Sequence, residues 1–585
     1  MVHVGIDIGT SNTVAAYVNE QGEAVAHHIE NSVLVPSVMY VDELGGRRTV
    51  GQAALDEWAD PEFDPAASFR RWKLAMGNEV VLGELAIGGS KRSTRVTPEQ
   101  LTTWLVEYVV GHIADGVGGL EVESVVVTVP HGWRRENPEK CVATRAAASL
   151  ATTNGTNLKV RELTLSEPVA AASYWLWAAR RGDTGAGDDF QGRTVLVVDI
   201  GGGTFDLSLV RVGAESDPLV VVDAINHEFA GDFATALVMA RVATQANADL
   251  GTTLPTDPGE LLTLVGGDES AWARAWFLGA QELVRKASTH LAAAASRNLT
   301  PRPFRNHFEM PDGEALRVQF THDEFLTVLE PFYASGRDLV RQFLGLQEAA
   351  DLPYGVVFAG GGSRIAGVAD EIVEPVLADV VKDVATVLGR IVLNDARVDQ
   401  AVALGAALVA SDVVTVEERL LYDIGLGVEV SQPIAKVLDL VAGERTVAVS
   451  PMLARGSRLP TEADSATLIG AVEIPAGHSA DFSVWVFDDP HHPFKQEWSL
   501  PRFASESSVS ASVVLTADTD GVLTVHLVRE DGVSETVLGR LARERSRRVT
   551  LTVDAGIEDK ESVQVVSPDD LKAAVDRVRR GKVTS

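Results

Sequence analysis

Aspartate and glycine stand together in two segments that repeat one local pattern, "VGIDIGTSNT" around Asp7 and "VLVVDIGGGTFDLSLV" around Asp199. In each, an apolar run predicts a strand, and the glycine permits a bend at which backbone N–H groups can point at phosphate oxygens. Because like charges repel, these carboxylates would act on a phosphate through a divalent metal, its waters or a monovalent cation. One such hairpin alone is typical of an ordinary tight turn; the repetition favours a triphosphate held from two sides.

A third glycine cluster, "VVFAGGGSRIAG", lies between a predicted strand and a predicted helix. Its glycines, Gly360 to Gly362, leave room for a flat group on which Arg364 could stack, although an ordinary strand–helix turn has the same composition. The sequence contains neither GxxxxGK[ST] nor GxGxxG, so the P-loop and Rossmann interpretations fail. Three glycine-rich turns in this order are far more specific than any one of them.

The elements that must position these turns form two lobes. Residues 1–180 alternate predicted strands and helices, "RRGDTGAGDDFQGR" interrupts the pattern, and a second strand-then-helix series follows up to Ala410. Each lobe opens with Asp-Ile-Gly, which indicates an internal duplication in an α/β fold. From Ile424 onward, short alternating strands and turns predict an all-β module. The predicted limits are 1–411 for the two-lobed α/β domain (lobes about 1–185 and 186–411), 412–423 for a linker, 424–556 for the β-domain and 557–585 for a short helical tail.

Composition excludes several classes of function. The 585 residues carry a net charge of −31, which makes nucleic acid a poor partner. Cys141 is the only cysteine, so neither an intramolecular disulfide nor a thiol-based zinc site is expected. No signal peptide and no apolar run of membrane-spanning length is apparent, so we expect a cytoplasmic protein without a membrane partner.

With these motifs, the chain resembles the 70-kDa heat-shock (DnaK-like) chaperones over residues 1 to about 556. "GIDIGTSNT" and "VVDIGGGTFDLSL" resemble the two phosphate motifs of that family, and "FAGGGSRIAG" resembles its adenosine motif. "VVVTVP" with "SEPVAAASY" resembles the first connecting region, and "VDQAVALGAALVA" the second. The resemblance implies an actin-like ATPase domain of two duplicated ribonuclease-H-like lobes, followed by a β-sandwich that binds polypeptide.

The resemblance also implies a site for ATP or ADP with Mg²⁺, and a slow ATPase. The implied catalytic residues are Asp7, Lys73, Glu167, Asp199 and Thr204. Lys73 would orient the attacking water or the γ-phosphate, unless it is only a surface lysine. Mg²⁺ would be held through waters by Asp7, Glu167 and Asp199, and a potassium-like ion by Asp206. The implied nucleotide contacts are Gly9, Thr10, Ser11, Asn12, Gly201, Gly202, Gly203, Glu282, Arg285, Lys286, Thr289, Gly360, Gly361, Arg364 and Asp399.

The C-terminal half carries a weaker resemblance. "LTADTDGVLTVHLV" resembles a strand pair of the peptide-binding sandwich, and "RLLYDIG" resembles the interdomain linker, here Leu420, Leu421, Tyr422 and Asp423. An apolar linker could dock on the lobes in one nucleotide state and come free in the other. The implied partners are an unfolded or extended polypeptide, a nucleotide exchange factor and a J-domain co-chaperone.

Several departures indicate a divergent, lidless bacterial relative. The helical lid of the family has no counterpart in the printed sequence. Leu163 stands where bacterial members carry an arginine for J-domain docking, which counts against a standard J-domain partner, although Arg161 is near. In "FAGDFA", Asp232 directly follows Gly231, so the acidic residue of the family after its double glycine is missing.

Three functions are compatible with the sequence. The leading one is an ATP-regulated, chaperone-like binder of unfolded polypeptide. The second is an ATP-gated module for one dedicated partner, and the missing lid and altered J-domain position keep it open. The third is a small-molecule kinase, against which the Asp206 motif and the β-domain count.

Overall fold

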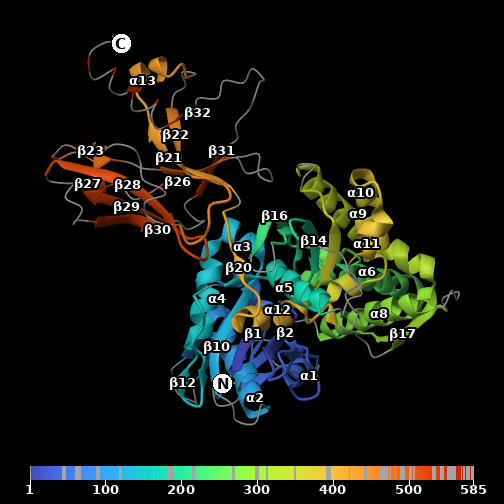
Figure 1. The fold of residues 1–585 in the computed structure, drawn as a ribbon. Helices are drawn as coiled ribbons and strands as arrows, with labels where there is room; N and C mark the ends of the chain where they lie inside the picture. The colour runs from blue at the N-terminus through green and yellow to red at the C-terminus, as the bar shows by residue number, and fades with distance from the viewer. Residues whose placement is uncertain are drawn as a thin grey trace. The chain divides into compact units, whose positions relative to one another are not determined.

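The computed structural model (Figure 1) describes residues 2–41, 48–59, 67–78, 80–86, 93–116, 121–162, 164–181, 190–213, 218–266, 271–296, 302–310, 314–347, 351–390, 397–420, 422–440, 445–461, 472–474, 476–477, 479–480, 483–487, 495–499, 503–504, 507–529, 535–540, 546–549, 561–567, 570, 573–574, 577 and 580. The chain forms two compact units. The first consists of Met1–Gly132 and Lys140–Val416, and the second of Trp133–Glu139 and Glu417–Ser585.

Two sheets of the first unit share a core of four strands in the same order, and the fifth strand of each lies at the opposite edge of that core. In the first lobe the order is β13 (Leu165–Ser166), β10 (Val122–Val129), β1 (Val2–Ile8), β2 (Asn12–Val18) and β3 (Ala24–Ala26), with β4 (Val35–Pro36) beside β2. In the second lobe it is β19 (Gly355–Ala359), β14 (Thr194–Ile200), β15 (Phe205–Arg211), β16 (Leu219–His227) and β20 (Val416–Glu417). In both lobes an antiparallel hairpin leads into a third strand, and the first strand also pairs in parallel with a later one. The mixed α/β class is confirmed, and the repeated order agrees with the expected duplication.

Two helices of small residues pack tightly in this unit, α5 (Glu167–Arg180) and α12 (Ala401–Ala410), and they lie beside each other in Figure 1. All ten residues of α12 are buried. A Cβ on Gly405 would overlap the carbonyl oxygen of Ala170 in α5, and a Cβ on Gly5 of β1 would overlap the backbone of Ala407. The glycines therefore permit backbone-to-backbone packing of α12 against both α5 and β1.

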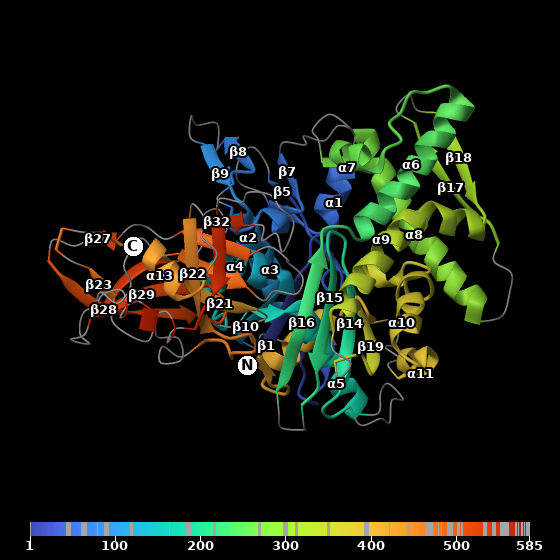
Figure 2. The same cartoon turned by 90° about the horizontal axis from the view of Figure 1, so that it is seen from above.

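The remaining elements build outward from the two sheets. Before α5 they are β5 (Val38–Val41), β6 (Arg48–Val50), α1 (Gln52–Ala59), β7 (Ser68–Arg70), η2 (Trp72–Ala75), β8 (Gly83–Ala86), β9 (Ser93–Val96), α2 (Pro98–Gly116), α3 (His131–Glu136), α4 (Pro138–Leu150), β11 (Thr152–Thr153) and β12 (Thr156–Asn157). After β16 they are α6 (Gly231–Leu250), α7 (Pro258–Gly266), α8 (Ala271–Ser296), β17 (Phe304–Glu309), β18 (Ala315–Phe320), α9 (His322–Gly345), η3 (Gly361–Arg364), η4 (Val368–Val373), α10 (Glu374–Val380) and α11 (Val384–Gly389). Figure 2 shows α6, α7, α8 and the β17–β18 hairpin beside one another, where they share a buried aromatic core.

The second unit is built mainly of strands. One sheet has the order β31 (Ser546–Val549), β26 (Lys495–Ser499), β25 (Ser483–Phe487), β21 (Asp423–Glu429), β22 (Arg445–Leu453) and β32 (Glu561–Val565). Another has β23 (Val472–Ile474), β28 (Val509–Ala517), β29 (Leu523–Arg529) and β30 (Glu535–Arg540), and β24 (Ser479–Ala480) pairs with β27 (Phe503–Ala504). A short helix that the sequence did not predict, α13 (Gln432–Val437), begins with a proline in its first turn.

The six-stranded sheet continues past residue 556, the predicted end of the β-domain, because β32 pairs in parallel with β22. Most of the tail after Ser567 lies outside the described residues. The stacking of the sheets into a sandwich and the C-terminal helix therefore stay predictions, as do the predicted domain limits.

The segment predicted as a linker is hydrogen-bonded within the second unit. The N–H of Leu420 donates to Ser457 O at 2.9 Å, and Leu420 O accepts from the N–H of Gly456 at 2.7 Å. Leu420 and Tyr422 are buried, and Asp423 accepts a hydrogen bond from the backbone N–H of Arg455. Leu421 lies outside the described residues. In this structure the apolar side chains of the segment are therefore part of a folded surface and not of a free linker.

Candidate functional site

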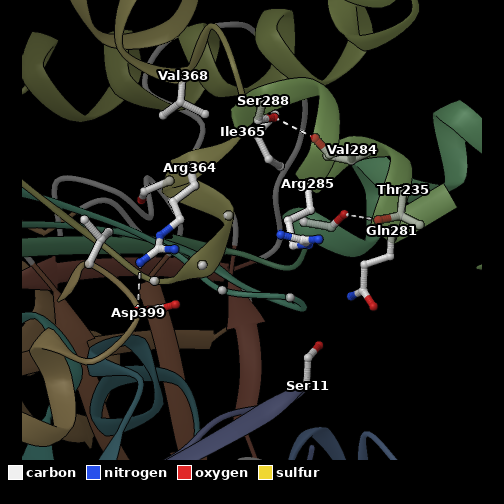
Figure 3. Close-up of a pocket in the computed structure, with 18 of the residues that line it drawn as sticks. Ser11, Thr235, Gln281, Val284, Arg285, Ser288, Arg364, Ile365, Val368 and Asp399 are labelled. Carbon is white, nitrogen blue, oxygen red and sulfur yellow. Dashed lines mark hydrogen bonds and ion pairs between the residues drawn. The ribbon is translucent and has the colours of Figure 1, made fainter. Parts of the chain in front are cut away.

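A cavity of about 1490 Å³ lies in the first unit, and both lobes line it. Figure 3 shows Ser11 of the first lobe opposite Gln281 and Arg285 of α8, with Arg364 and Asp399 on another side. The predicted site residues among its lining are Asp7, Gly9, Thr10, Ser11, Asn12, Lys73, Glu167, Asp199, Gly201, Gly202, Thr204, Glu282, Arg285, Thr289, Gly360, Gly361, Arg364 and Asp399. Gly203, Asp206 and Lys286 are not among them.

The two predicted phosphate loops meet across the cavity. They are the bends of the β1–β2 and β14–β15 hairpins. A Cβ on Gly202 would overlap Ser11 Oγ, and a Cβ on Gly203 would lie 3.1 Å from Thr10 Cγ2. Glycine is therefore needed in the second loop because side chains of the first loop fill the space. Gly203 does not line the cavity; its missing side chain lets the second loop lie close to Thr10 of the first.

Lys73 is buried and forms an ion pair with Glu167. Its Nζ donates to Glu167 Oε1 at 2.6 Å, and each side chain is 8% exposed. Lys73 comes from η2 and Glu167 from the first turn of α5, so segments far apart in the sequence build the pair. Although burial alone would lower it, the pKa of Lys73 is raised by the carboxylates of Glu167 and Asp7. The interpretation of Lys73 as a surface lysine is wrong.

Buried carboxylates surround this lysine. Burial, together with the charge of Glu167, raises the pKa of Asp7 to about 7. The pKa of Asp199 is also raised, chiefly by burial and secondly by the charges of Glu167 and Asp206. Asp206 is opposite Asp199 in the hairpin register and is buried. One lysine does not balance this negative charge, so the arrangement favours a further cation.

The carboxylates fit a cation that is held through waters. Among the described residues, no group of three His, Cys, Asp or Glu side chains is placed to hold a metal directly. Oxygen ligands suit Mg²⁺, which keeps several waters when it binds. Asp7, Glu167 and Asp199 all line the cavity and could orient such waters, whereas Asp206 lies beside Asp199 and outside the lining.

At the other end of the cavity, the predicted nucleoside contacts form ion pairs with one another. Arg285 donates from Nε and Nη2 to the two oxygens of Glu282, each at 2.7 Å, and Lys286 Nζ lies 3.3 Å from Glu282 Oε1. Arg364 Nη2 donates to Asp399 Oδ1 at 3.0 Å (Figure 3). These pairs leave guanidinium faces for stacking and carboxylate oxygens for hydroxyl groups.

The glycines of the third cluster differ in their surroundings. Gly360 has a positive φ of 74°, and a Cβ on it would overlap Asp199 Oδ1. A Cβ on Gly361 would meet nothing within 4 Å. Gly360 therefore lets this turn approach the carboxylate of Asp199, and Gly361 leaves open space in the cavity.

Sequence reasoning missed several residues of the lining, among them Gln281, Ser288 and Asp232. Ser288 accepts a hydrogen bond from the N–H of Ala366 and so joins α8 to the third glycine turn. Gln281 and Ser288 lie in the predicted stretch "AQELVRKAST", one residue from predicted contacts, and helical spacing could have pointed to them.

The structure does not test the predicted J-domain docking position, because Leu163 lies outside the described residues. Its neighbour Arg161 forms a bidentate ion pair with Asp412, at 2.8 and 2.7 Å, and donates to Val409 O. Arg161 therefore fixes the C-terminal end of α12 in this structure.

The repeated sheet order, the buried helices and the cavity between the lobes are consistent with the actin-like ATPase class. Comparison with known proteins specifies the class further. Residues 3–264 match the model of the family described as Hsp70 protein. The chain is 29% identical over 453 residues to chaperone protein HscA homologs of Burkholderia cenocepacia and Burkholderia orbicola, which covers 73% of this chain. A homolog of Burkholderia thailandensis is 29% identical over 426 residues, or 70% of this chain.

These matches confirm the resemblance to the Hsp70 chaperones. The aligned region spans 62% of the length of the first two relatives and 58% of the third.

Within the part of the chain that the structure describes, no helix is both long and apolar enough to cross a membrane.

Proposed function

We propose that this protein binds Mg-ATP in the cavity of its first unit, hydrolyses it slowly, and uses the nucleotide state to regulate binding of unfolded or extended polypeptide by its second unit. The buried Lys73–Glu167 pair between Asp7 and Asp199 is the observation that carries the proposal. The pair lines the same cavity as the two glycine loops from different lobes, which is the arrangement needed to hold a polyphosphate from both sides.

Transfer of a phosphoryl group to water requires positioning and charge neutralisation more than covalent chemistry. Bound Mg²⁺ would supply neutralisation of phosphate charge. In this chain the N–H groups at Thr10, Ser11 and the second loop would bind the phosphates. Lys73 would stabilise the negative charge that develops in transfer, because its raised pKa keeps it protonated. Asp199 and Glu167 would order the waters of the cation and the attacking water.

The nucleoside would occupy the opposite end of the cavity. Arg364, held by Asp399, offers a planar face to a base, and Glu282, held by Arg285, offers carboxylate oxygens to the ribose hydroxyls. Lys286 supports this end through its ion pair with Glu282 and does not line the cavity. A potassium-like ion beside Asp206 belongs to the same proposal.

Polypeptide binding is supported by the likeness of Leu515–Val528 to the peptide-binding sandwich and by relatives whose names describe chaperones. A nucleotide exchange factor and a J-domain protein are proposed as partners on the same basis. Arg161 is engaged by Asp412, so J-domain docking would need to use or replace this ion pair.

The first test is nucleotide binding and single-turnover hydrolysis of the purified full chain with Mg²⁺. Lys73→Ala and Asp199→Asn are expected to lower the hydrolysis rate on the order of a hundredfold or more, because each removes charge or water positioning at the reacting phosphate. Lys159→Ala and Asp249→Asn, at exposed positions, are the matched controls and should match the wild type. Absence of ATP binding by the wild type would overturn the proposal.

The second test is fluorescence anisotropy of several unrelated unfolded peptides, titrated with the protein in ADP and then in ATP. Binding of several peptides that ATP weakens supports a general chaperone. If ATP binds but no peptide does, the second unit serves a dedicated partner. Asp199→Asn should bind peptides without the response to ATP.

A further inference from the structure

Three polar atoms near the second phosphate loop are buried and make no hydrogen bond within the described part of the chain. They are Ser11 Oγ, Arg71 Nε and Asp232 Oδ1. Gly202 connects two of them, because a Cβ at this position would overlap Ser11 Oγ and lie 3.3 Å from Asp232 Oδ1. Buried polar groups in folded proteins nearly always have a partner, so a cluster without one indicates a place for a ligand or its waters.

Asp232 is fixed firmly behind this loop. It lies in the first turn of α6, its backbone N–H donates to Gly202 O at 2.8 Å, and the N–H of Gly231 donates to Gly201 O at 3.0 Å. Its side chain is 5% exposed and lines the cavity. The start of α6 therefore moves with the second loop, and the carboxylate moves with it.

Arg71 reaches Asp232 from the other lobe. It directly precedes η2, the element that carries Lys73, and its Nε lies 3.6 Å from Asp232 Oδ2. Burial raises the pKa of Asp232, while the charges of Arg71 and Arg70 oppose the rise. The separation of 3.6 Å makes the Arg71–Asp232 ion pair a loose one without a hydrogen bond. The N–H groups of the guanidinium thus remain available to an anion.

The backbone of Arg71 is unusual for its residue type. Its φ is 57°, in the left-handed region that a residue with a long side chain rarely occupies. Such conformations collect at ligand-binding and catalytic sites, where the surrounding structure holds them. Here the strained residue stands two positions before Lys73; it is not itself among the lining residues, whereas Lys73 and Asp232, the ion-pair partner of Arg71, both are.

The charges determine which ligand fits. Asp232 would repel a phosphate, and Arg71 would repel a cation, so neither residue alone explains the cluster. A phosphate could accept hydrogen bonds from Ser11 Oγ and from Arg71, while Asp232 holds the guanidinium in place from the side of the second loop. Because Arg71 and Asp232 come from different lobes, their ion pair joins the lobes at this point.

We infer that Arg71, positioned by Asp232, contacts the terminal phosphate of a nucleoside triphosphate and makes the protein prefer the triphosphate over the diphosphate. The inference rests on the proposed nucleotide site. Arg71 is then a specificity-determining residue, and Asp232 is a positioning residue that acts through it.

The test is isothermal titration calorimetry of the full chain with Mg-ATP and Mg-ADP, under conditions in which hydrolysis is slow. Arg71→Ala should lower the affinity for ATP on the order of tenfold or more and leave that for ADP nearly unchanged, because a charge-assisted contact to one phosphate is lost. Asp232→Asn should lower the same ratio, and the double variant should lower it no further than Arg71→Ala. Arg71→Lys should recover part of the preference, since it keeps the charge and loses the planar fork.

The affinity for ADP also reports folding, because a variant that binds ADP normally has an intact cavity. Arg341→Ala, which breaks an exposed ion pair on α9, is the matched control and should leave both affinities unchanged. Equal loss of ATP and ADP affinity in Arg71→Ala would overturn the inference in favour of a structural role. An unchanged ratio of ATP affinity to ADP affinity would also overturn the inference but would leave the proposed nucleotide site intact. A wild type that binds neither nucleotide would overturn both the inference and the proposed site.

Discussion

The carboxylate of Asp7 should make the stability of the ligand-free first unit depend on pH. Its pKa in the folded protein is about 7, compared with 3.8 for an ordinary aspartate, and burial is the main cause. A group whose pKa is raised by folding binds more protons in the folded than in the unfolded state between these two values. The free energy of unfolding should therefore fall as the pH rises from about 4 to about 7. The full effect of a shift of this size is about 4 kcal/mol.

The assay is urea denaturation between pH 5 and pH 8, applied to the transition that Mg-ADP stabilises, because that transition reports the first unit. Asp7→Asn carries no charge at any pH, so the excess of its unfolding free energy over that of the wild type should grow as the pH rises from 5 to 8, mostly below about pH 7. Added Mg²⁺ should stabilise the wild type more at pH 8 than at pH 5 and affect Asp7→Asn less. Parallel pH profiles of the two proteins would refute the argument that burial of this charge opposes folding.

Three further predictions concern packing. Gly202→Ala should weaken nucleotide binding by tenfold or more in calorimetry while circular dichroism stays unchanged, because its Cβ would force the two phosphate loops apart. Gly405→Ala should destabilise the first unit by about 1–3 kcal/mol in urea denaturation, since its Cβ would overlap the Ala170 carbonyl, whereas Gly345→Ala meets open space and should not. Leu420→Ala should lower the unfolding free energy of the second unit by about 2–4 kcal/mol, because this side chain is buried; an unchanged value would restore the view of a free linker.

Features that depend on a few adjacent residues could be predicted from the sequence. The pattern of each Asp-Ile-Gly hairpin is local, because consecutive residues form the apolar strand, the bend and the second strand. The duplication followed from their repetition, and the small residues of α12 followed from its composition. Most residues that the motifs implied for the site also line the cavity.

Features that depend on distant partners could not be predicted in the same way. The burial of Lys73 depends on Glu167, which lies 94 residues away. The loose pair of Arg71 and Asp232 also joins separate lobes, and no motif implied either residue for the site. The burial of Leu420 depends on the turn that follows β22, so an apolar segment beside charged residues resembled a linker.

The repeated hairpins also show why duplication of a motif does not produce two equal sites. Side chains of the first loop, at Thr10 and Ser11, occupy the space that Gly202 and Gly203 leave in the second loop. Two copies of the first loop would collide there, and two copies of the second would leave a gap. The loops are therefore complementary and not merely similar: at this contact the first contributes the side chains of Thr10 and Ser11, and the second contributes close approach of its backbone. Under the proposed function, a phosphate chain between the loops would have Thr10 and Ser11 on one side and Gly202 with the start of α6 on the other. Ser11 Oγ and Asp232 Oδ1, which make no hydrogen bond within the described residues, both lie beside Gly202, where the two copies differ.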